Sequence, residues 1–240
     1  MEADAVSALG SGLGPAFAAA CRCILDTAGR VVVTGMGKSG HIAGKIAATL
    51  ASTGTPAFFV HPGEASHGDM GMITASDCVV ALSNSGSTHE ILTLLPLIKR
   101  LGIPLISMTG SDTSELAQAA DVHLLASVET EACPLNLAPT SSTTAALVMG
   151  DALAIAILEA RGFTAEEFAF SHPGGALGKR LLLRVADVMV SGSDIPTITP
   201  TAVLADAIYR RHCRYRQNVG RERHGAARID RGDLVATHRE

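Results

Sequence analysis

The amino-acid sequence predicts a doubly wound α/β fold with a mainly parallel, five-stranded sheet flanked by helices. Short apolar runs alternate with segments of helical periodicity along the chain, which is the order of βαβ units. Hydrophobic residues make up 47% of the chain, aromatic residues only 3%, and Trp is absent. A core built from Ala, Val, Leu, Ile and Gly suits a parallel sheet that is covered on both faces by Ala-rich helices.

The first half of the chain alternates between predicted helices and strands. Residues 3–28 are rich in Ala and predict a helix that is interrupted between Gly10 and Pro15, because Gly and Pro both disfavour a continuous helix. The predicted elements that follow are a strand at 30–35, a tight loop at 36–40, a helix at 42–51, a strand at 57–60 and a polar loop at 61–71.

The second half repeats the same alternation. An apolar run at 78–82 predicts a buried strand, and apolar residues recur at helical spacing from Ile91 to Arg100. A strand and a helix are predicted within 104–120, a short strand at 122–126 and a long helix at 139–161. In a doubly wound sheet, ligands bind at the carboxyl ends of the strands, so we expect the side chains that follow each strand to share one edge. These are Lys38, His61, residues 83–88 and Thr109.

Composition favours a soluble cytoplasmic protein. No apolar stretch reaches membrane-spanning length without a charge or a breaker, and the acidic N-terminus lacks the basic region of a signal peptide. The five cysteines show no metal-ligand clustering, so we expect reduced thiols in the core. Residues 1–209 hold 10 Lys and Arg against 19 Asp and Glu. We therefore expect neither nucleic acid nor a membrane as a partner of this part.

Residues 83–88, with the sequence Ser-Asn-Ser-Gly-Ser-Thr, form a hydroxyl-rich turn between a predicted strand and a predicted helix. Backbone N–H groups and hydroxyl donors would gather at the helix N-terminus, where the helix dipole favours an anion. Gly86 lets the backbone come close to that anion. We interpret this turn as a phosphate site. The alternative is a helix start that Thr88 caps and that binds no ligand.

Residues 35–40, with the sequence Gly-Met-Gly-Lys-Ser-Gly, follow a strand and suggest a nucleotide site. A P-loop needs Gly where this chain has Val32, so an ATP site is rejected. The dinucleotide pattern needs an acid at the end of the next strand, which here ends in Val60 and His61, so NAD is not expected. What remains is Lys38 on a strand-end loop, suited to a phosphate or a developing oxyanion. The alternative is a solvated surface Lys, although the chain has only four lysines.

Three further stretches combine His, acids or rigid turns. Residues 61–69 hold two His and two acids, which suit a metal site, a sugar-hydroxyl site or an ordinary polar loop. Glu129 and Glu131 follow the last strand and would supply a general base or form an exposed acidic loop. His172 precedes Pro-Gly-Gly, which places its imidazole on a rigid turn for chemistry or simply terminates a helix.

Together these motifs resemble the sugar isomerase (SIS) domain family over residues 5–185. Within that family, five motifs in the same order are similar to those of the D-arabinose 5-phosphate isomerases of the Kdo pathway. The resemblance implies an enzyme that interconverts ribulose 5-phosphate and arabinose 5-phosphate through an enediolate and feeds lipopolysaccharide synthesis. The motifs are Gly-Met-Gly-Lys-Ser-Gly, His-Pro-Gly-Glu-Ala-x-His-Gly-Asp, Ser-Asn-Ser-Gly, acid-Ala-Cys-Pro-Leu-Asn-Leu-Ala-Pro-Thr-Ser-Ser and Ser-His-Pro-Gly-Gly-x-Leu-Gly.

The resemblance also implies roles for individual residues. Ser87 departs from the Glu often found at its position, but it only neighbours the phosphate loop. His61 falls on a position regarded as binding zinc or another divalent ion, although the resemblance implies that catalysis requires no cofactor. The positions regarded as catalytic are Lys38, Glu90, Glu131 and His172. The substrate-contacting positions are Gly54, Thr55, His61, His67, Ser83, Ser85 and Thr88.

An aldose–ketose isomerase has to move a proton between C1 and C2 and to stabilise an oxyanion. We expect Glu131 to move the carbon proton, His172 to open the ring or shuttle protons between O1 and O2, and Lys38 to stabilise the enediolate or the phosphate. Glu90 would orient Lys38 or a group of a neighbouring subunit. The resemblance further implies a homo-oligomer, expected to be a tetramer. The alternatives are an isomerase of another phosphosugar, such as a sedoheptulose or hexulose phosphate, and a phosphosugar sensor without turnover.

The C-terminal part differs from the isomerase domain that we predict at 1–185. Residues 186–209 resemble the start of a CBS module. Residues 210–240 hold nine Arg and four acids, have almost no apolar periodicity and cannot build a core. Our hypothesis is that the reading frame shifted near codon 210 and truncated a CBS pair, which sequencing of that stretch of DNA tests. The alternative is a genuine basic tail that binds an acidic partner.

Overall fold

The computed structural model describes residues 1–175 and 184–192, together with residues 195, 197, 199, 201, 203, 205 and 208. The chain divides into two units, Met1–Leu182 and Leu183–Glu240. Helix α11 (Val185–Val188) belongs to the second unit. Part of the predicted CBS start at 186–209, and all of the Arg-rich tail at 210–240, lies outside the described residues. All other described elements belong to the first unit.

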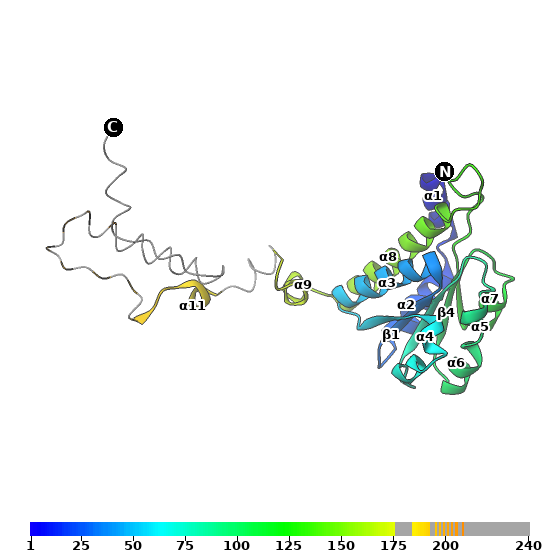
Figure 1. The fold of residues 1–240 in the computed structure, drawn as a ribbon, viewed down its shortest axis with the longest axis horizontal. Coiled ribbons are helices and arrows are strands. Elements are labelled where there is room, and N and C mark those ends of the chain that lie inside the picture. The colour runs from blue at the N-terminus through cyan, green and yellow to red at the C-terminus, as the bar shows by residue number, and fades with distance from the viewer. Residues whose placement is uncertain are drawn as a thin grey trace. The chain divides into compact units, whose positions relative to one another are not determined.

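The first unit is built on a five-stranded parallel sheet with the order β2-β1-β3-β4-β5, which confirms the predicted fold class (Figure 1). Strand β1 connects to β2 on one side, and the chain then returns to β3 on the other side of β1. The strand order therefore reverses between β1 and β3. The strands are β1 (Val31–Gly35), β2 (Ala57–Val60), β3 (Cys78–Leu82), β4 (Leu105–Thr109) and β5 (Val122–Leu125).

Helices cover both faces of the sheet because successive strand residues point to opposite faces, and the central strands are buried on both. One apolar core packs Val31 and Val33 against helices α1, α2, α3 and α8, and the other packs Val32 against α4 to α7. The helices of the first face are α1 (Glu2–Gly12), α2 (Pro15–Leu25), α3 (Gly37–Ser52) and α8 (Ser141–Arg161). Those of the second face are α4 (Pro62–Ala65), α5 (His89–Leu92), α6 (Leu95–Leu101) and α7 (Glu115–Ala119), with a 3-10 turn η1 (Asp69–Met72). Helix α9 (Ala165–Ser171) follows α8.

Two predicted elements are wrong in detail. The predicted loop at 36–40 is the first turn of α3, which begins at Gly37, so Lys38 is a helical residue. The predicted helix at 91–100 is broken into α5 and α6. Pro96 explains this break, because proline cannot donate a hydrogen bond to the carbonyl of Leu92 and its ring would collide with that carbonyl.

Helix α8 is the one continuous helix in the described part of the chain that meets the length and hydropathy of a membrane span. Helices α1 and α2 would add a second span only if they were counted as one bent segment. A buried core helix meets the same criteria, and α8 packs Leu153 and Ile157 into the core beside α3. Its apolar composition is thus explained by its place in the fold.

Asp77 braces the amino-terminal edge of the sheet. Its buried carboxylate accepts the backbone N–H groups of Arg30 and Thr74, both at 2.7 Å, and the Thr74 hydroxyl at 2.9 Å. Burial raises the pKa of Asp77, but these hydrogen bonds outweigh it and leave the pKa below its ordinary value. The carboxylate is therefore the form that stabilises the fold.

We expect Asp77→Asn to lower the free energy of unfolding by about 1–3 kcal/mol at pH 7, because an amide would set an N–H donor against one of these donors. A lowered folded-state pKa contributes stability above the unfolded-state value, and this is lost as the pH falls through the folded-state value. Urea denaturation should therefore show that the free energies of unfolding of the wild type and the variant differ at pH 7 and converge at pH 3. A constant difference would contradict this, and Asp26→Asn, which alters an exposed acid, is the control.

Candidate functional site

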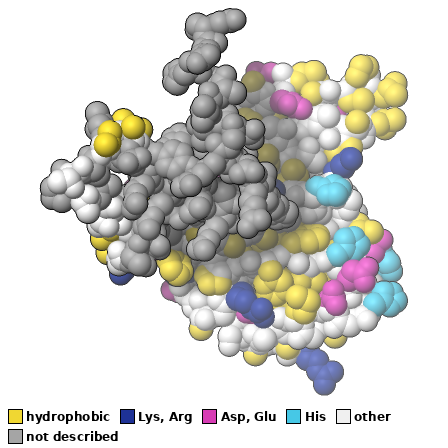
Figure 2. All heavy atoms as spheres, turned by 60° about the vertical axis from the view of Figure 1, so that its left-hand side comes forward, with side chains coloured by type: hydrophobic (Ala, Val, Ile, Leu, Met, Phe, Trp, Pro, Cys, Tyr) yellow, Lys and Arg dark blue, Asp and Glu magenta, His cyan; other side chains and the backbone are white. Residues whose placement is uncertain are grey.

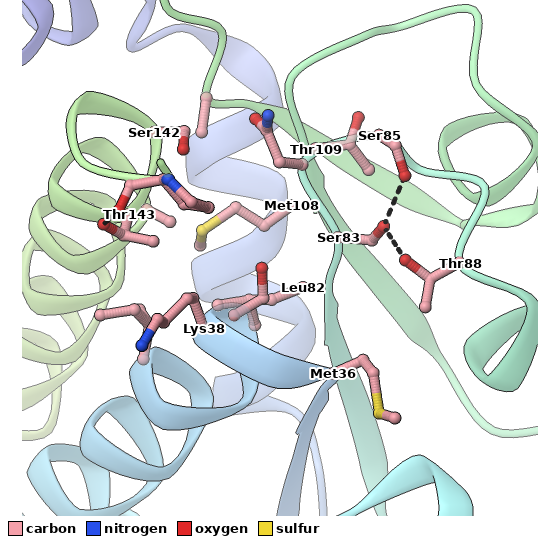
Figure 3. Close-up of a pocket in the computed structure, with 16 residues that line it drawn as sticks. Met36, Lys38, Leu82, Ser83, Ser85, Thr88, Met108, Thr109, Ser142 and Thr143 are labelled. Atoms are coloured by element: carbon pink, nitrogen blue, oxygen red, sulfur yellow. Dashed lines mark hydrogen bonds between the residues drawn. The ribbon is translucent and has the colours of Figure 1, made fainter. Parts of the chain in front are cut away.

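A cavity of about 330 Å³ opens at the carboxyl edge of the sheet, where the strand order reverses between β1 and β3. Ligands of doubly wound proteins bind at such switch points, in cavities of about 300–1,000 Å³. Helices α3 and α8 form one side of the cavity and the turn after β3 forms the other (Figure 3). The lining residues are Met36, Lys38, Ser39, Ile42, Leu82, Ser83, Asn84, Ser85, Thr88, Met108, Thr109, Ala126, Pro139, Ser142, Thr143 and Ala146.

The serine turn, residues 83–88, supplies a cluster of three hydroxyl groups. Ser83 Oγ lies 2.7 Å from Thr88 Oγ1 and 3.5 Å from Ser85 Oγ, and it accepts the N–H of Gly86 at 3.0 Å (Figure 3). The two bonds within the cluster use at most two of its three hydroxyl protons. At least one O–H therefore remains for a ligand, and an anion is the strongest acceptor for it.

The turn does not open a long helix, as the sequence predicted, because α5 is a single turn. Thr88 occupies the N-cap position, but its side chain makes no capping bond and contacts Ser83 instead. The helix-capping alternative for Thr88 is thus not what the structure shows. Donors at this turn are its hydroxyls and the unpaired N–H groups of the first helical turn rather than the dipole of a long helix.

The connection between β4 and α7 holds the serine turn in place. The N–H of Gly110 donates to the carbonyl of Asn84 at 2.9 Å, and the N–H of Leu116 donates to the carbonyl of Gly86 at 3.0 Å. Gly86 has φ = +64°, and a Cβ at this position would overlap the side chain of Ser114. The close backbone approach at Gly86 is therefore made to Ser114, and the approach to an anion predicted from the sequence stays a prediction.

Lys38 lies in the first turn of α3 and lines the cavity opposite the serine turn (Figure 3). Among the described residues, Lys38 takes part in no ion pair, whereas Lys45 on the same helix pairs with Asp151. A cation in the first turn of a helix is unfavourable by about 0.3–1 kcal/mol, because the helix dipole is positive there. An unpaired Lys at this position fits an anionic ligand, which both the side chain and the helix end would attract.

Glu131 caps the start of α8 and does not line the cavity. One carboxylate oxygen accepts the N–H groups of Thr140 at 2.7 Å and Ser142 at 3.1 Å, and the other accepts the Ser142 hydroxyl. Burial raises the pKa of Glu131, but the bonds from Ser142 and Thr140 outweigh it and leave the pKa below its ordinary value. The helix end that would otherwise bind an anion is thus already occupied by an anion of the chain itself.

The other acidic and imidazole groups predicted for this edge lie beside the cavity rather than on its wall. Glu90 is in α5 and is the second residue after the serine turn. His61 follows β2 and caps α4, where its Nδ1 accepts the N–H of Gly63 at 3.2 Å. His67 is exposed in the loop after α4. All three follow the carboxyl ends of β2 or β3, as predicted.

The predicted metal position at His61 has only part of a site. No group of three or more His, Cys, Asp or Glu side chains suited to a metal is present among the residues that the structure describes. One nitrogen of His61 is already engaged by Gly63, which leaves Nε2 as its only free ligand atom. The residues of one described chain do not fit a complete metal site, since metals usually take three or four protein ligands.

Three predicted residues lie far from the cavity of the same chain. Gly54 and Thr55 precede β2 at the amino-terminal edge of the sheet, and Gly54 lines a second cavity with Phe58 and Arg30. His172 follows α9, which lies beyond the C-terminal end of α8 (Figure 1). Helix α8 starts at the first cavity and runs for 21 residues, which is about 30 Å. The structure therefore separates these residues from Lys38 and the serine turn.

His172 is nevertheless held in a defined orientation. Its Nδ1 lies 2.9 Å from the carbonyl of Phe168, and its ring stacks on the Phe168 ring at 4.2 Å between centroids. A carbonyl can only accept, so Nδ1 carries the proton when the ring is neutral, and Nε2 is left as the basic nitrogen.

Ser142 and Thr143 are cavity residues that sequence reasoning missed. The sequence analysis placed both in the predicted helix at 139–161 and Ser142 at the end of one of the five motifs, but it assigned neither of them a role. A signal was present, because a helix that follows a strand of a parallel sheet starts near the carboxyl edge of that sheet. The 15 residues between β5 and α8 concealed this relation.

Figure 2 shows how the charged side chains are distributed over the described part of one face. Lys and Arg side chains are separated from one another on the described part of this face, and histidines lie next to acidic side chains. A nucleic-acid site needs a continuous basic surface. This distribution agrees with the acidic composition of residues 1–209.

Similarity to known proteins agrees with this geometry. A model of the SIS domain matches residues 24–156. Arabinose 5-phosphate isomerase KdsD from Pseudomonas aeruginosa is 69% identical over 208 residues, covering 87% of this chain and 64% of the relative. The protein of the same name from Escherichia coli K12 is 60% identical, with 87% and 63% covered. The chain thus spans somewhat less than two thirds of the length of these curated relatives.

A solved structure shares the described fold. The structure of E. coli CFT073 c3406 in complex with A5P is 47% identical, with a TM-score of 0.68 over 72% of this chain and 92% of that one. The described fold is therefore shared with a protein whose structure was solved in complex with A5P.

Proposed function

The chain belongs to the SIS domain family, and on this premise we propose that it is an arabinose 5-phosphate isomerase. It would interconvert D-ribulose 5-phosphate and D-arabinose 5-phosphate in the cytoplasm and feed Kdo and lipopolysaccharide synthesis. The observation that carries the proposal is the cavity at the switch point, where a hydroxyl cluster faces Lys38, which takes part in no ion pair with the described residues. The names of the similar relatives support the choice of substrate.

The two sides of the cavity suit the two ends of a sugar phosphate. Ser83, Ser85 and Thr88 would donate to the phosphate, since their cluster retains at least one free proton. Lys38 would stabilise the oxygen that becomes negative when the carbon proton leaves. Glu131 remains beside the opposite wall as an anion, which would repel the phosphate and so orient the sugar toward α8.

Proton transfer needs a base near C1 and C2. The Nε2 atom of His172 is free to act as a base, because Nδ1 bonds to a backbone carbonyl. Both oxygens of Glu131, in contrast, already accept hydrogen bonds, and the pKa of Glu131 is lowered. We therefore assign the carbon proton to His172 and the support of oxygen protons to Glu131, which exchanges the roles expected from the sequence. Glu90 would orient Lys38 or a group of a neighbouring copy.

This assignment requires a second copy of the chain. His172, Gly54 and Thr55 lie at the opposite end of the unit from Lys38, so in one chain they cannot contact the same substrate. A homo-oligomer, which we expect to be a tetramer, would bring these residues of one copy to the cavity of another. No step of this reaction uses a metal, and zinc or another divalent ion at His61 would need ligands beyond the described residues of one chain.

The test is proton exchange followed by NMR with ribulose 5-phosphate in D₂O. We expect arabinose 5-phosphate that carries deuterium at C2, with a loss of at least about 100-fold in His172→Ala, because a base contributes about 10²–10⁴ to the rate. His41→Ala changes an exposed histidine of α3 outside the cavity and should behave as wild type. Tight binding without exchange would instead indicate a sensor, and exchange only with another sugar phosphate would indicate a different isomerase.

Mixing distinguishes a contribution from a second copy. Chains that carry Lys38→Met and chains that carry His172→Ala should both be inactive alone. When they are refolded together, some cavities would combine an intact Lys38 with an intact His172 from another copy, and activity should return. A mixture as inactive as its components would overturn the assignment across copies.

A further inference from the structure

We propose that Ser142 contacts the substrate and recognises one sugar hydroxyl specifically as a hydrogen-bond donor. The inference deepens the proposed function, since it assigns a specificity-determining residue of the same cavity. It rests on the direction of the hydrogen bonds around the start of α8.

The proton of the Ser142 hydroxyl is already donated to Glu131. Glu131 has no proton to donate as a carboxylate, so the close contact between its oxygen and Ser142 Oγ has the serine as donor. The second oxygen of Glu131 accepts the N–H of Thr140, the Thr140 hydroxyl at 3.1 Å and the N–H of Ser142, which favours the ionised form. Burial and these hydrogen bonds set the pKa of this carboxyl group, and no charged side chain of the described residues contributes to it.

The hydrogen-bonding capacity that the Ser142 hydroxyl retains is available to a ligand in the cavity. Ser142 is 96% buried and is one of the residues that line the cavity (Figure 3). A hydroxyl that has donated its only proton offers just lone pairs to a ligand. Ser142 should therefore accept a hydrogen bond and should not bind a carbonyl or phosphate oxygen.

Thr143 also offers a hydrogen-bond acceptor to the cavity from α8. Its hydroxyl donates to the carbonyl of Thr140 at 2.9 Å, and it also lines the cavity. The hydroxyls of α8 that line the cavity therefore accept hydrogen bonds, whereas Lys38 and the serine turn donate them. The O–H groups of a ligand would lie against α8, and its anionic oxygens against Lys38 and the serine turn.

The test uses D-arabinitol 5-phosphate, which has the sugar hydroxyls but no carbonyl and cannot turn over, and its four monofluoro analogues. Fluorine takes the place of a hydroxyl but cannot donate a hydrogen bond. In calorimetric titrations, we expect one analogue to bind wild-type protein about 5–10-fold more weakly than the parent, as for the loss of one hydrogen bond. Ser142→Ala should weaken the parent by a similar factor and should bind that analogue and the parent equally.

Several variants make the result decisive. Ser141→Ala removes the neighbouring hydroxyl, which is buried without a partner in the described part of the chain and does not line the cavity, and should bind like wild type. Ser142→Thr keeps the hydroxyl and should keep the discrimination, and Ser142→Cys replaces the alanine variant if that variant does not fold. If every fluoro penalty persists in Ser142→Ala, or the variant binds the parent like wild type, the inference is overturned. Failure of wild-type protein to bind the parent would instead overturn the proposed function itself.

Discussion

Lys38→Met is expected to lower kcat/KM for arabinose 5-phosphate by about 10²–10³-fold, the loss typical of one electrostatic group that stabilises an oxyanion. Lys38 has no ion pair among the described residues, so its charge is available to the ligand. Stability should be unchanged or slightly higher, because the substitution removes a cation from the positive end of α3. Steady-state kinetics combined with thermal unfolding would measure both effects.

Lys45→Met is the matched control on the same helix. Lys45 lies two turns further along α3, pairs with Asp151 and does not line the cavity. Its loss should leave kcat/KM near the wild-type value and remove at most the small contribution of an exposed ion pair, about 0–1 kcal/mol. Equal effects of the two substitutions on kcat/KM would show that Lys38 acts through the helix rather than through the ligand.

The sheet could be predicted from sequence because its information is local. Each strand is a short apolar run, and alternation with helical segments permits few topologies. The prediction that Lys38, the serine turn and Thr109 share one edge then follows, since carboxyl ends of parallel strands coincide. The cavity contains all three, although α3 starts earlier than its apolar pattern indicated.

The site was less predictable because its decisive contacts are not local. Glu131 reaches Ser142 only because the intervening loop folds back, with Asn136 in a left-handed conformation at φ = 52°. No periodicity in the sequence encodes that return. Residue types alone therefore presented Glu131 as an available base, whereas its hydrogen bonds show it as a cap that fixes the start of α8.

Distance along the fold was also hidden in the sequence. Gly54, Thr55 and His172 follow helices that run away from the cavity, so their motifs can resemble site motifs while lying at the other end of the unit. A sequence motif does not show whether its residues act in the cavity of their own chain or in the cavity of another copy. That is why the mixing experiment, rather than any further inspection of motifs, decides how the site is completed.

Gly86→Ala is expected to raise KM by at least about 10-fold and to lower the free energy of unfolding by about 1–3 kcal/mol. The left-handed conformation of residue 86 would strain any residue with a Cβ. The new methyl group would also overlap Ser114, which is held by its bond to the carbonyl of Ser111 at 2.8 Å. Relief of the overlap would move the serine turn, and with it the hydroxyl cluster at the cavity.

Gly102→Ala separates backbone strain from the movement of the turn. Gly102 has nearly the same φ of +68° at the end of α6, but a Cβ there would meet no atom within 4 Å. It should lower stability by a similar amount through the same strain and leave KM unchanged, because α6 does not reach the cavity. Measuring KM and urea denaturation for both variants then tests the phosphate turn directly. If KM rises equally in both, the turn is not the site that anchors the substrate.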